Sequence, residues 1–254
     1  MRISAIVLAK NNDNTIEKTL QSLVEFEDVV VYDNGSTDKT MQIAKEFKNV
    51  NLVKGEFKGF GWSKNQAVSF AKNDWVIIID SDEVVDSKLL NTLKTKELDE
   101  NTVYQLNFKA YYKDIQVKYC GWNNQKIKRM YNRKFTSYNM NDVHEDIISD
   151  DFNLELLDGN VEHYSYHSIS QFVIKADHYS TLFAKNNVGK KSSSPLKAIS
   201  NGIYSFIKTY FFKRGFLDGY VGLIISFSHM VTNFYKYIKL YELNKELKTT
   251  SEPK

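Results

Sequence analysis

The chain has 254 residues, of which 42% are hydrophobic and 26% are charged, a composition typical of one soluble α/β domain with an appendage. Its formal net charge is only +3, so a nucleic-acid binder that relies on bulk charge is not indicated. The single cysteine, Cys120, excludes an internal disulfide framework and makes a reducing cytosol the expected compartment. The apolar run within residues 1–10 is too short for a signal peptide, and we expect a first strand there.

Short β-branched apolar runs alternate with helical patterns over the first 80 residues. This spacing predicts strands at residues 3–9, 28–33, 50–53 and 75–79, with helices at about 16–24, 38–48 and 63–72. Asp13 or Asn14 is available to cap the first helix. The alternation predicts βαβ units and a Rossmann-like, mostly parallel twisted sheet flanked by helices. Ligands of such sheets bind beyond the carboxyl ends of the strands, where Asn11, Asp33 and Asp80 are expected to face one crevice.

The pattern changes after residue 100. Apolar and polar residues alternate over 104–112, which predicts a strand with one wet face, and a further strand is expected at 126–132. A helix is expected at about 168–186. The small, basic stretch 189–195 ends in proline and is the best linker candidate.

Two aromatic-rich segments lie between residues 199 and 243, with basic residues interspersed at Lys208, Lys213, Arg214, Lys236 and Lys239. This pattern predicts an amphipathic helical extension that lies on a membrane surface. A helical pair that packs on the catalytic domain or on a partner is the alternative. A helix that spans the bilayer is disfavoured, because His229 and Asn233 interrupt the longer segment.

An acidic cluster follows the strand expected at 75–79, in the sequence DSDE. Alternate residues of an extended segment point the same way, so Asp80 and Asp82 are expected to converge. Such a pair holds a hard divalent cation when a diphosphate supplies further oxygens, although an isolated D-x-D is equally often a solvated turn. An EF-hand is excluded, since Val85 stands where its glycine belongs and Asn91 where its glutamate belongs.

Several segments in order resemble the family-2 glycosyltransferases of the GT-A fold: the first strand with Asn11, VVVYDNGSTDKT at 29–40, GFGWSKNQA at 59–67 and IIIDSDE at 77–83. VHED at 143–146 and FFKRGFLDGYVG at 211–222 resemble the subgroup that adds sugars to the lipopolysaccharide inner core. The resemblance implies an inverting transfer from a UDP-hexose, with glucose as the expected sugar, to a lipid-linked saccharide. It also implies Mg²⁺ or Mn²⁺ as cofactor and a place at the inner face of the cytoplasmic membrane. Acceptors of capsule or other lipid-carrier glycans are the alternative.

The expected catalytic domain covers residues 1–190, with a nucleotide-binding half at about 1–100 and an acceptor half at about 101–190. Residues 191–254 form the expected extension. The resemblance places Asp33 at the nucleobase or ribose, and Ser36, Thr37 and Asp38 in the turn after it. Gly35 permits that turn, while Ser36 or Thr37 is also suited to cap the next helix.

The resemblance places Lys64 and Asn65 near the diphosphate, although Lys64 alone reads equally as an exposed helical lysine. It places Asp80, with Ser81 beside it, at the ribose or at a metal-bound water. Asp82 is then the direct metal ligand. Glu83 either lies behind these residues or is solvated.

An inverting transfer needs a base that removes the proton of the acceptor hydroxyl. The resemblance assigns this role to Glu145, with Asp146 as the alternative, and His144 then binds donor phosphate or orients Glu145. Three adjacent polar residues also suit an ordinary surface turn. His163 is a candidate to complete the metal shell, or a hydrogen-bonded structural residue.

Rival classes fit the sequence less well. Gly59 and Gly61 precede a helix, but Lys64 stands at the third glycine of a dinucleotide-binding fingerprint. Residues 9–15 do not resemble the glycine-rich loop of sugar-nucleotide pyrophosphorylases, and no P-loop pattern is present. A membrane-associated protein without catalytic activity explains the aromatic tail but leaves Asp33, Asp80 and Asp82 unexplained.

Overall fold

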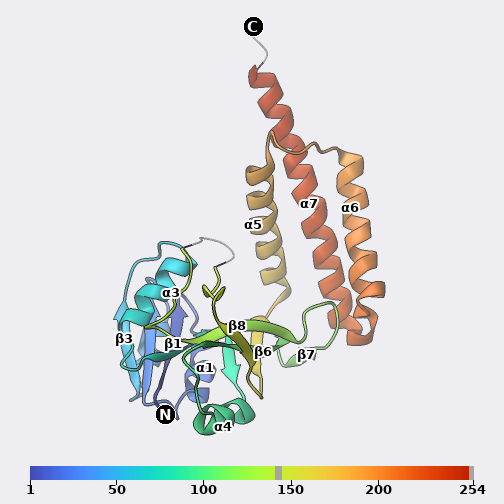
Figure 1. Cartoon of the computed structure of the whole chain (residues 1–254). Helices are drawn as coiled ribbons and strands as arrows, with labels where there is room; N and C mark the ends of the chain where they lie inside the picture. The colour runs from blue at the N-terminus through green and yellow to red at the C-terminus, as the bar shows by residue number, and fades with distance from the viewer. Residues whose placement is uncertain (141–144, 252–254) are drawn as a thin grey trace. The chain divides into compact units, whose positions relative to one another are not determined.

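The computed structural model describes residues 1–140 and 145–251. They fold into two compact units. Unit 1 comprises residues 1–109 and 124–164, and unit 2 comprises residues 110–123 and the chain from 165 onward. Figure 1 shows unit 1 as a twisted sheet with helices against it and unit 2 as mostly long helices.

The nucleotide-binding half of unit 1 is a parallel sheet in the order β3-β2-β1-β4. Its strands are β1 (Ile3–Ala9), β2 (Asp28–Asp33), β3 (Val50–Lys54) and β4 (Trp75–Asp80). The valine and isoleucine side chains of β1, β2 and β4 are buried, as expected of parallel strands covered on both faces. In register, Ala9 lies opposite Asp33 and Leu8 opposite Asp80, so the three strands end at one edge.

The first three helices connect these strands, as the alternation predicted: α1 (Ile16–Ser22), α2 (Thr40–Ala44) and α3 (Phe60–Ser69). A fourth helix, α4 (Ser87–Thr95), comes later in the chain, after β5 (Glu83–Val85). The expected caps of the first two were wrong. Thr15 is the N-cap residue of α1 and Lys39 that of α2, and neither makes a side-chain capping bond. Asp86 does cap α4, since its Oδ1 accepts the Leu89 N–H at 2.7 Å.

The second half of the sheet continues from β4 in the order β8-β6-β10-β5 and is mainly antiparallel. The strands are β5 (Glu83–Val85), β6 (Thr102–Tyr112), β8 (Gln125–Asn132), β9 (Asn153–Leu156) and β10 (Val161–Tyr166). β6 and β8 match the two strands predicted after residue 100. β5 pairs with β10 so that Glu83 lies opposite His163, which joins the acidic cluster to a histidine far along the chain.

Unit 2 contains β7 (Ile115–Val117), α5 (Ile169–Asn187), α6 (Pro195–Ile207), the π-helical turn η1 (Lys208–Phe212), the 3₁₀ turn η2 (Gly215–Asp218) and α7 (Gly219–Ser251). Residues 188–194 join α5 to α6, and Pro195 opens α6 behind the Ser194 cap, a position that suits its missing N–H. Helix α7 packs against both α5 and α6, and it lies between them in Figure 1. Within the described residues, no helix has the length and apolar character needed to cross a bilayer.

His229 predicts how the stability of unit 2 depends on pH. Its Nδ1 lies 3.1 Å from the Thr209 hydroxyl, and burial, aided by the charges of Lys213 and Lys236, lowers its pKa to about 4. Between that value and the ordinary value of about 6.5, the unfolded chain binds a proton that the folded chain excludes, so stability is lost as the pH falls through this window. We expect His229→Gln to remove on the order of 2 kcal/mol of this loss between pH 7 and pH 4.5, measured by urea unfolding.

The matched control is His178→Gln, because His178 is exposed on α5. An equal change of the pH dependence in both variants would show that burial of His229 is not its source.

Candidate active site

A cavity of about 410 Å³ opens at the edge of unit 1 where the parallel strands end. Its walls include Lys10 and Asn12 after β1, Asn34 after β2, and the segment Asp80–Asp82 after β4. Phe57 and Phe60 add an aromatic wall, with ring centroids 5.1 Å apart. This is the place where open α/β sheets bind their ligands.

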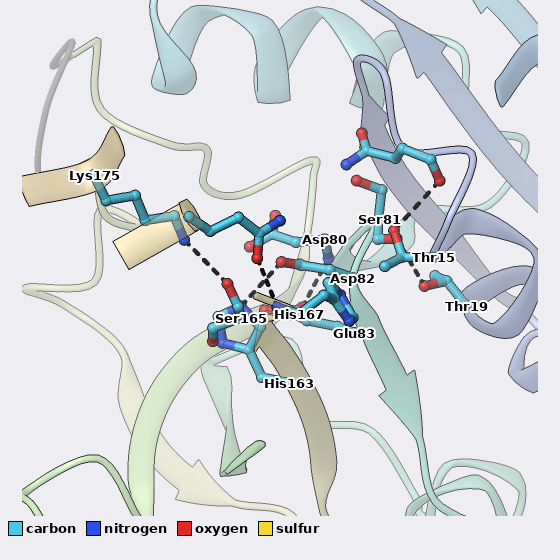
Figure 2. Close-up of polar contacts among 12 residues, drawn as sticks. Thr15, Thr19, Asp80, Ser81, Asp82, Glu83, His163, Ser165, His167 and Lys175 are labelled. Atoms are coloured by element: carbon cyan, nitrogen blue, oxygen red, sulfur yellow. Dashed lines mark hydrogen bonds and ion pairs between the residues drawn. The ribbon is translucent and has the colours of Figure 1, made fainter. Parts of the chain in front are cut away.

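Asp82 and His163 meet at the wall of this cavity. The Asp82 Oδ2 lies 3.5 Å from the His163 Nε2, and Figure 2 shows the imidazole directed at the carboxylate. Two backbone carbonyls fix the acidic turn: that of Ser81 accepts the Thr19 hydroxyl at 3.0 Å, and that of Asp82 accepts the Tyr164 N–H at 2.9 Å. Burial alone would lower the pKa of His163, but its interaction with Asp82 and the nearby carboxylates raises it.

Asp80 lines the same cavity but is held by a buried cation. The Arg129 Nη2 donates to Asp80 Oδ2 at 2.7 Å and to Glu83 Oε1 at 2.9 Å. Glu83 Oε2 accepts the backbone N–H of Asp80 at 2.7 Å. One guanidinium therefore orients both carboxylates, and the backbone of Asp80 is tied to the second of them.

The network separates the proton affinities of its two carboxyl groups. Burial tends to raise the pKa of Asp80, but the charges of Arg129 and Lys64 outweigh it and hold the pKa well below its usual range. Burial raises the pKa of Glu83 to about 7, against the opposing charge of Arg129. Asp80 is therefore ionised at neutral pH, where Glu83 still binds a proton part of the time.

Arg129 was missed by sequence reasoning, and the solvated alternative for Glu83 was wrong. The Glu83 side chain is fully buried, and that of Arg129 is nearly so. The Arg129 guanidinium also lies 5.3 Å from the centre of the Phe108 ring. The period of β8 gave no usable signal, because a register shift opposite Tyr104 and Gln105 interrupts it. Ile127 and Met130 pack into one core cluster and Tyr131 into another.

Asn11 and Asp33 hold the turns at the edge of the cavity. The Asn11 Oδ1 accepts the Thr37 N–H at 2.8 Å, and the Asn11 N–H donates to the Ser36 hydroxyl at 3.0 Å. The buried Asp33 carboxylate accepts the N–H groups of Gly35 and Ser36. Among the described residues of these two turns, Asn12 lines the cavity in place of Asn11, and Asn34 lines it in place of Asp33. The nucleotide contacts of Asn11 and Asp33 stay predictions.

Lys64 is buried on α3, so its interpretation as an exposed helical lysine was wrong. Its Nζ forms an ion pair with the Glu145 Oε1 at 2.7 Å and lies 4.9 Å from the centre of the Tyr138 ring. The charge of Lys64 also acts on Asp80. The structure thereby brings the proposed base into the same electrostatic cluster as the acidic turn.

The remaining candidates are Asp146, Asn65 and His144. Asp146 forms an ion pair with Lys128 at 2.5 Å, and its side chain is 52% exposed against 18% for Glu145. Asn65 clamps the backbone of Tyr138 through two hydrogen bonds, of 2.8 and 3.0 Å. His144 lies outside the described residues.

The side chains of Asp82 and His163 are suited to bind a divalent cation that takes few of its ligands from the protein. The described part of the chain contains no group of three or more histidine, cysteine, aspartate or glutamate side chains arranged to hold a metal. Asp82 and His163 nevertheless bring a carboxylate oxygen and an imidazole nitrogen together at the cavity wall. Mg²⁺ is commonly bound by one or two protein carboxylates together with substrate phosphates and water, so this small donor set is compatible with an ion that arrives with a diphosphate.

The parallel half-sheet, its antiparallel continuation and the acidic turn at the carboxyl edge define a glycosyltransferase of the GT-A fold that uses nucleotide sugars. The family described as glycosyl transferase family 2 matches residues 4–151. The chain belongs to this family.

Relatives support the assignment over nearly the whole chain. An uncharacterized glycosyltransferase of Rickettsia typhi is 33% identical over 96% of this chain and 88% of its own length. The lipopolysaccharide core biosynthesis glycosyltransferase LpsC of Rhizobium meliloti is 24% identical over 94% of this chain and 92% of its own. Among solved structures, the mannosyltransferase PcManGT of Pyrobaculum calidifontis, in complex with GDP-Man and Mn²⁺, is 15% identical with a TM-score of 0.49, over 99% of this chain and 76% of that one.

Proposed function

We propose that the protein transfers a hexose, with glucose as the expected sugar, from a UDP-sugar to a lipid-linked saccharide such as lipopolysaccharide core, with inversion at the anomeric carbon. The observation that carries the proposal is the contact of 3.5 Å between Asp82 and His163 at the cavity wall, beside Asp80. A relative whose name refers to lipopolysaccharide core biosynthesis supports the acceptor class. Capsule or other lipid-carrier glycans are the alternative acceptors.

Each residue of the site then has a distinct task. Asp82 and His163 hold Mg²⁺ or Mn²⁺, which supplies positive charge for the diphosphate that leaves. Asp80, fixed by Arg129, binds the ribose as an ionised acceptor. Phe57 and Phe60 exclude water from one side of the nucleotide.

Glu145 removes the proton from the acceptor hydroxyl as that oxygen attacks the sugar. Lys64 positions it through the ion pair to Oε1, and a carboxylate has a second oxygen that can take up the proton.

Since a lipid-linked acceptor is presented at a bilayer, we place the protein at the inner face of the cytoplasmic membrane, held by the helices within residues 196–243.

Asp82→Asn tests the donor and metal site. We expect it to abolish the thermal stabilisation that UDP and Mn²⁺ give together and to lower the rate of transfer by roughly three orders of magnitude. Both effects are expected because the bound metal depends on the charge of the Asp82 carboxylate. The melting temperature of the protein alone should stay within a few degrees of the wild type, since the side chain is partly exposed. Thermal-shift measurements and release of UDP report the two effects.

Asp74→Asn is the matched control, because Asp74 lies just before the amino-terminal end of β4, whereas Asp82 follows its carboxyl end. Asp74 forms an ion pair with Lys134. Metal-dependent binding of UDP that persists in Asp82→Asn would contradict the proposed donor site. A protein that binds UDP-glucose but transfers its sugar to no acceptor would favour a sugar-nucleotide-binding protein without catalytic activity.

A further inference from the structure

Helix α6 buries its small residues and exposes its large ones. Ala198 and Gly202 are buried, as is Thr209 in the turn η1 that follows, and a Cβ on Gly202 would lie 3.2 Å from the Met230 carbonyl oxygen of α7. Ser205 accepts the Asn233 side-chain N–H at 2.9 Å on the same side. Small and polar groups at helical spacing therefore make the close contact with α7.

The outer stripe of α6, which continues into η1 and is called the α6 stripe below, carries the large apolar side chains. They recur every three or four positions and all are exposed: Leu196, Ile199, Ile203, Ile207 and Phe211. A helix on the surface of a water-soluble domain normally has the opposite arrangement, with its apolar stripe turned to the core. Apolar side chains that point outward from small-residue packing are typical of helices that contact lipid.

The exposed apolar surface continues from α6 onto α7 and α5. Phe206 contacts Phe227 of α7, with ring centroids 6.4 Å apart, and Tyr210, at 5.3 Å. Phe227 in turn lines a groove of about 410 Å³ between α7 and α5, and Val173 of α5 lines it too. At the turn between α6 and α7, the side chain of Phe212 is 76% exposed. We call this surface the apolar face: the α6 stripe, Phe206, Tyr210, the groove, and the exposed turn residues Phe211, Phe212, Phe216 and Leu217.

Charge identifies what covers the apolar face. Residues 178–217 contain seven lysines and arginines and no aspartate or glutamate. The whole of unit 2 has fifteen basic and six acidic residues, a net charge of +9, in a chain whose total is +3. Lys208, Lys213 and Arg214 are exposed beside the aromatic residues of the turn. A second copy docked through the same face would bring like charges together, whereas an anionic bilayer attracts them.

We propose that the apolar face of unit 2 inserts into an anionic bilayer at the boundary between the headgroups and the acyl chains, with the turn at Phe211 and Phe212 and the groove between α5 and α7 facing the acyl chains. The proposal rests on the proposed function, since it names the partner surface at which a lipid-linked acceptor is met. The proposal assigns the contact with lipid to one face shared by α5, α6 and α7, and not to α7 alone.

The test uses the full chain and sedimentation with vesicles of phosphatidylcholine, alone or with about one third phosphatidylglycerol. Wild type should bind the anionic vesicles, release as salt rises, and bind the neutral ones weakly. Val173→Asp and the double variant Phe211→Ser/Phe212→Ser should each weaken binding roughly tenfold or more. Ile174→Asp is the matched control, since Ile174 is 66% exposed against 62% for Val173 but lies outside the groove lining.

Three results would overturn the proposal. One is wild type that binds neither vesicle, and another is an equal loss in Val173→Asp and Ile174→Asp. The third is a dimer, seen by ultracentrifugation, that Val173→Asp dissociates, because it would show a second copy on this face. Hydrolysis of the UDP-sugar should persist in Val173→Asp, while Asp82→Asn should still bind vesicles, so failure of this proposal and failure of the proposed function are distinguishable.

Discussion

Replacing Glu145 by glutamine should stop sugar transfer while leaving donor binding almost unchanged. Glutamine keeps the size of the side chain and an oxygen that accepts the Lys64 ammonium, now 2.7 Å from Oε1, but it cannot take the proton of the acceptor hydroxyl. A general base contributes about 10² to 10⁴ in rate, so kcat should fall by roughly that factor. The Kd for UDP, measured calorimetrically in the presence of Mn²⁺, should change by less than about threefold.

Asp146→Asn separates the two candidates for the base. Asp146 pairs with Lys128 and is about half exposed, and its exchange should change kcat by less than about tenfold if Glu145 is the base. The opposite pattern, with Asp146→Asn inactive and Glu145→Gln active, would transfer the role to Asp146. An equal loss of donor affinity and of turnover in Glu145→Gln would instead show that the ion pair with Lys64 shapes the donor site.

The parallel half of the sheet was predictable because its signal is local. β1 and β2 have the limits that their apolar runs indicate, and β4 extends one residue further. A strand buried on both faces has to be apolar throughout, so its ends show where polar residues begin. The same logic placed Asp80 and Asp82 at the carboxyl edge, where both now line one cavity.

The contacts within the site were not predictable, because they depend on pairings between distant segments. β5 has only three residues, too few to show a period, and its partner β10 comes much later in the chain. That pairing is what sets His163 beside Asp82. Asn11 and Asp33 show the same limit: the strand ends were right, but turn geometry decides which neighbouring residue lines the cavity.

Arg129→Met should be the most destabilising single exchange in unit 1. It leaves the fully buried Glu83 carboxylate without its cation and removes the partner of Asp80. Breaking a buried ion pair by removing one member costs about 3–5 kcal/mol, which urea unfolding at neutral pH would measure. Lys126→Met is the matched control, because Lys126 is exposed on the same strand, and its exchange should cost less than about 0.5 kcal/mol.

Adding Glu83→Gln to Arg129→Met distinguishes stability from positioning. If the unpaired, buried Glu83 carboxyl group is the main cost, the double variant should regain at least about 1 kcal/mol over Arg129→Met. A double variant no more stable than Arg129→Met would assign the loss to packing around Phe108, over whose ring the guanidinium lies. A double variant that folds would still lack the 2.7 Å contact between Asp80 and Arg129. A lower affinity of this variant for UDP than that of the wild type would then measure how much donor binding depends on the orientation that Arg129 gives to Asp80.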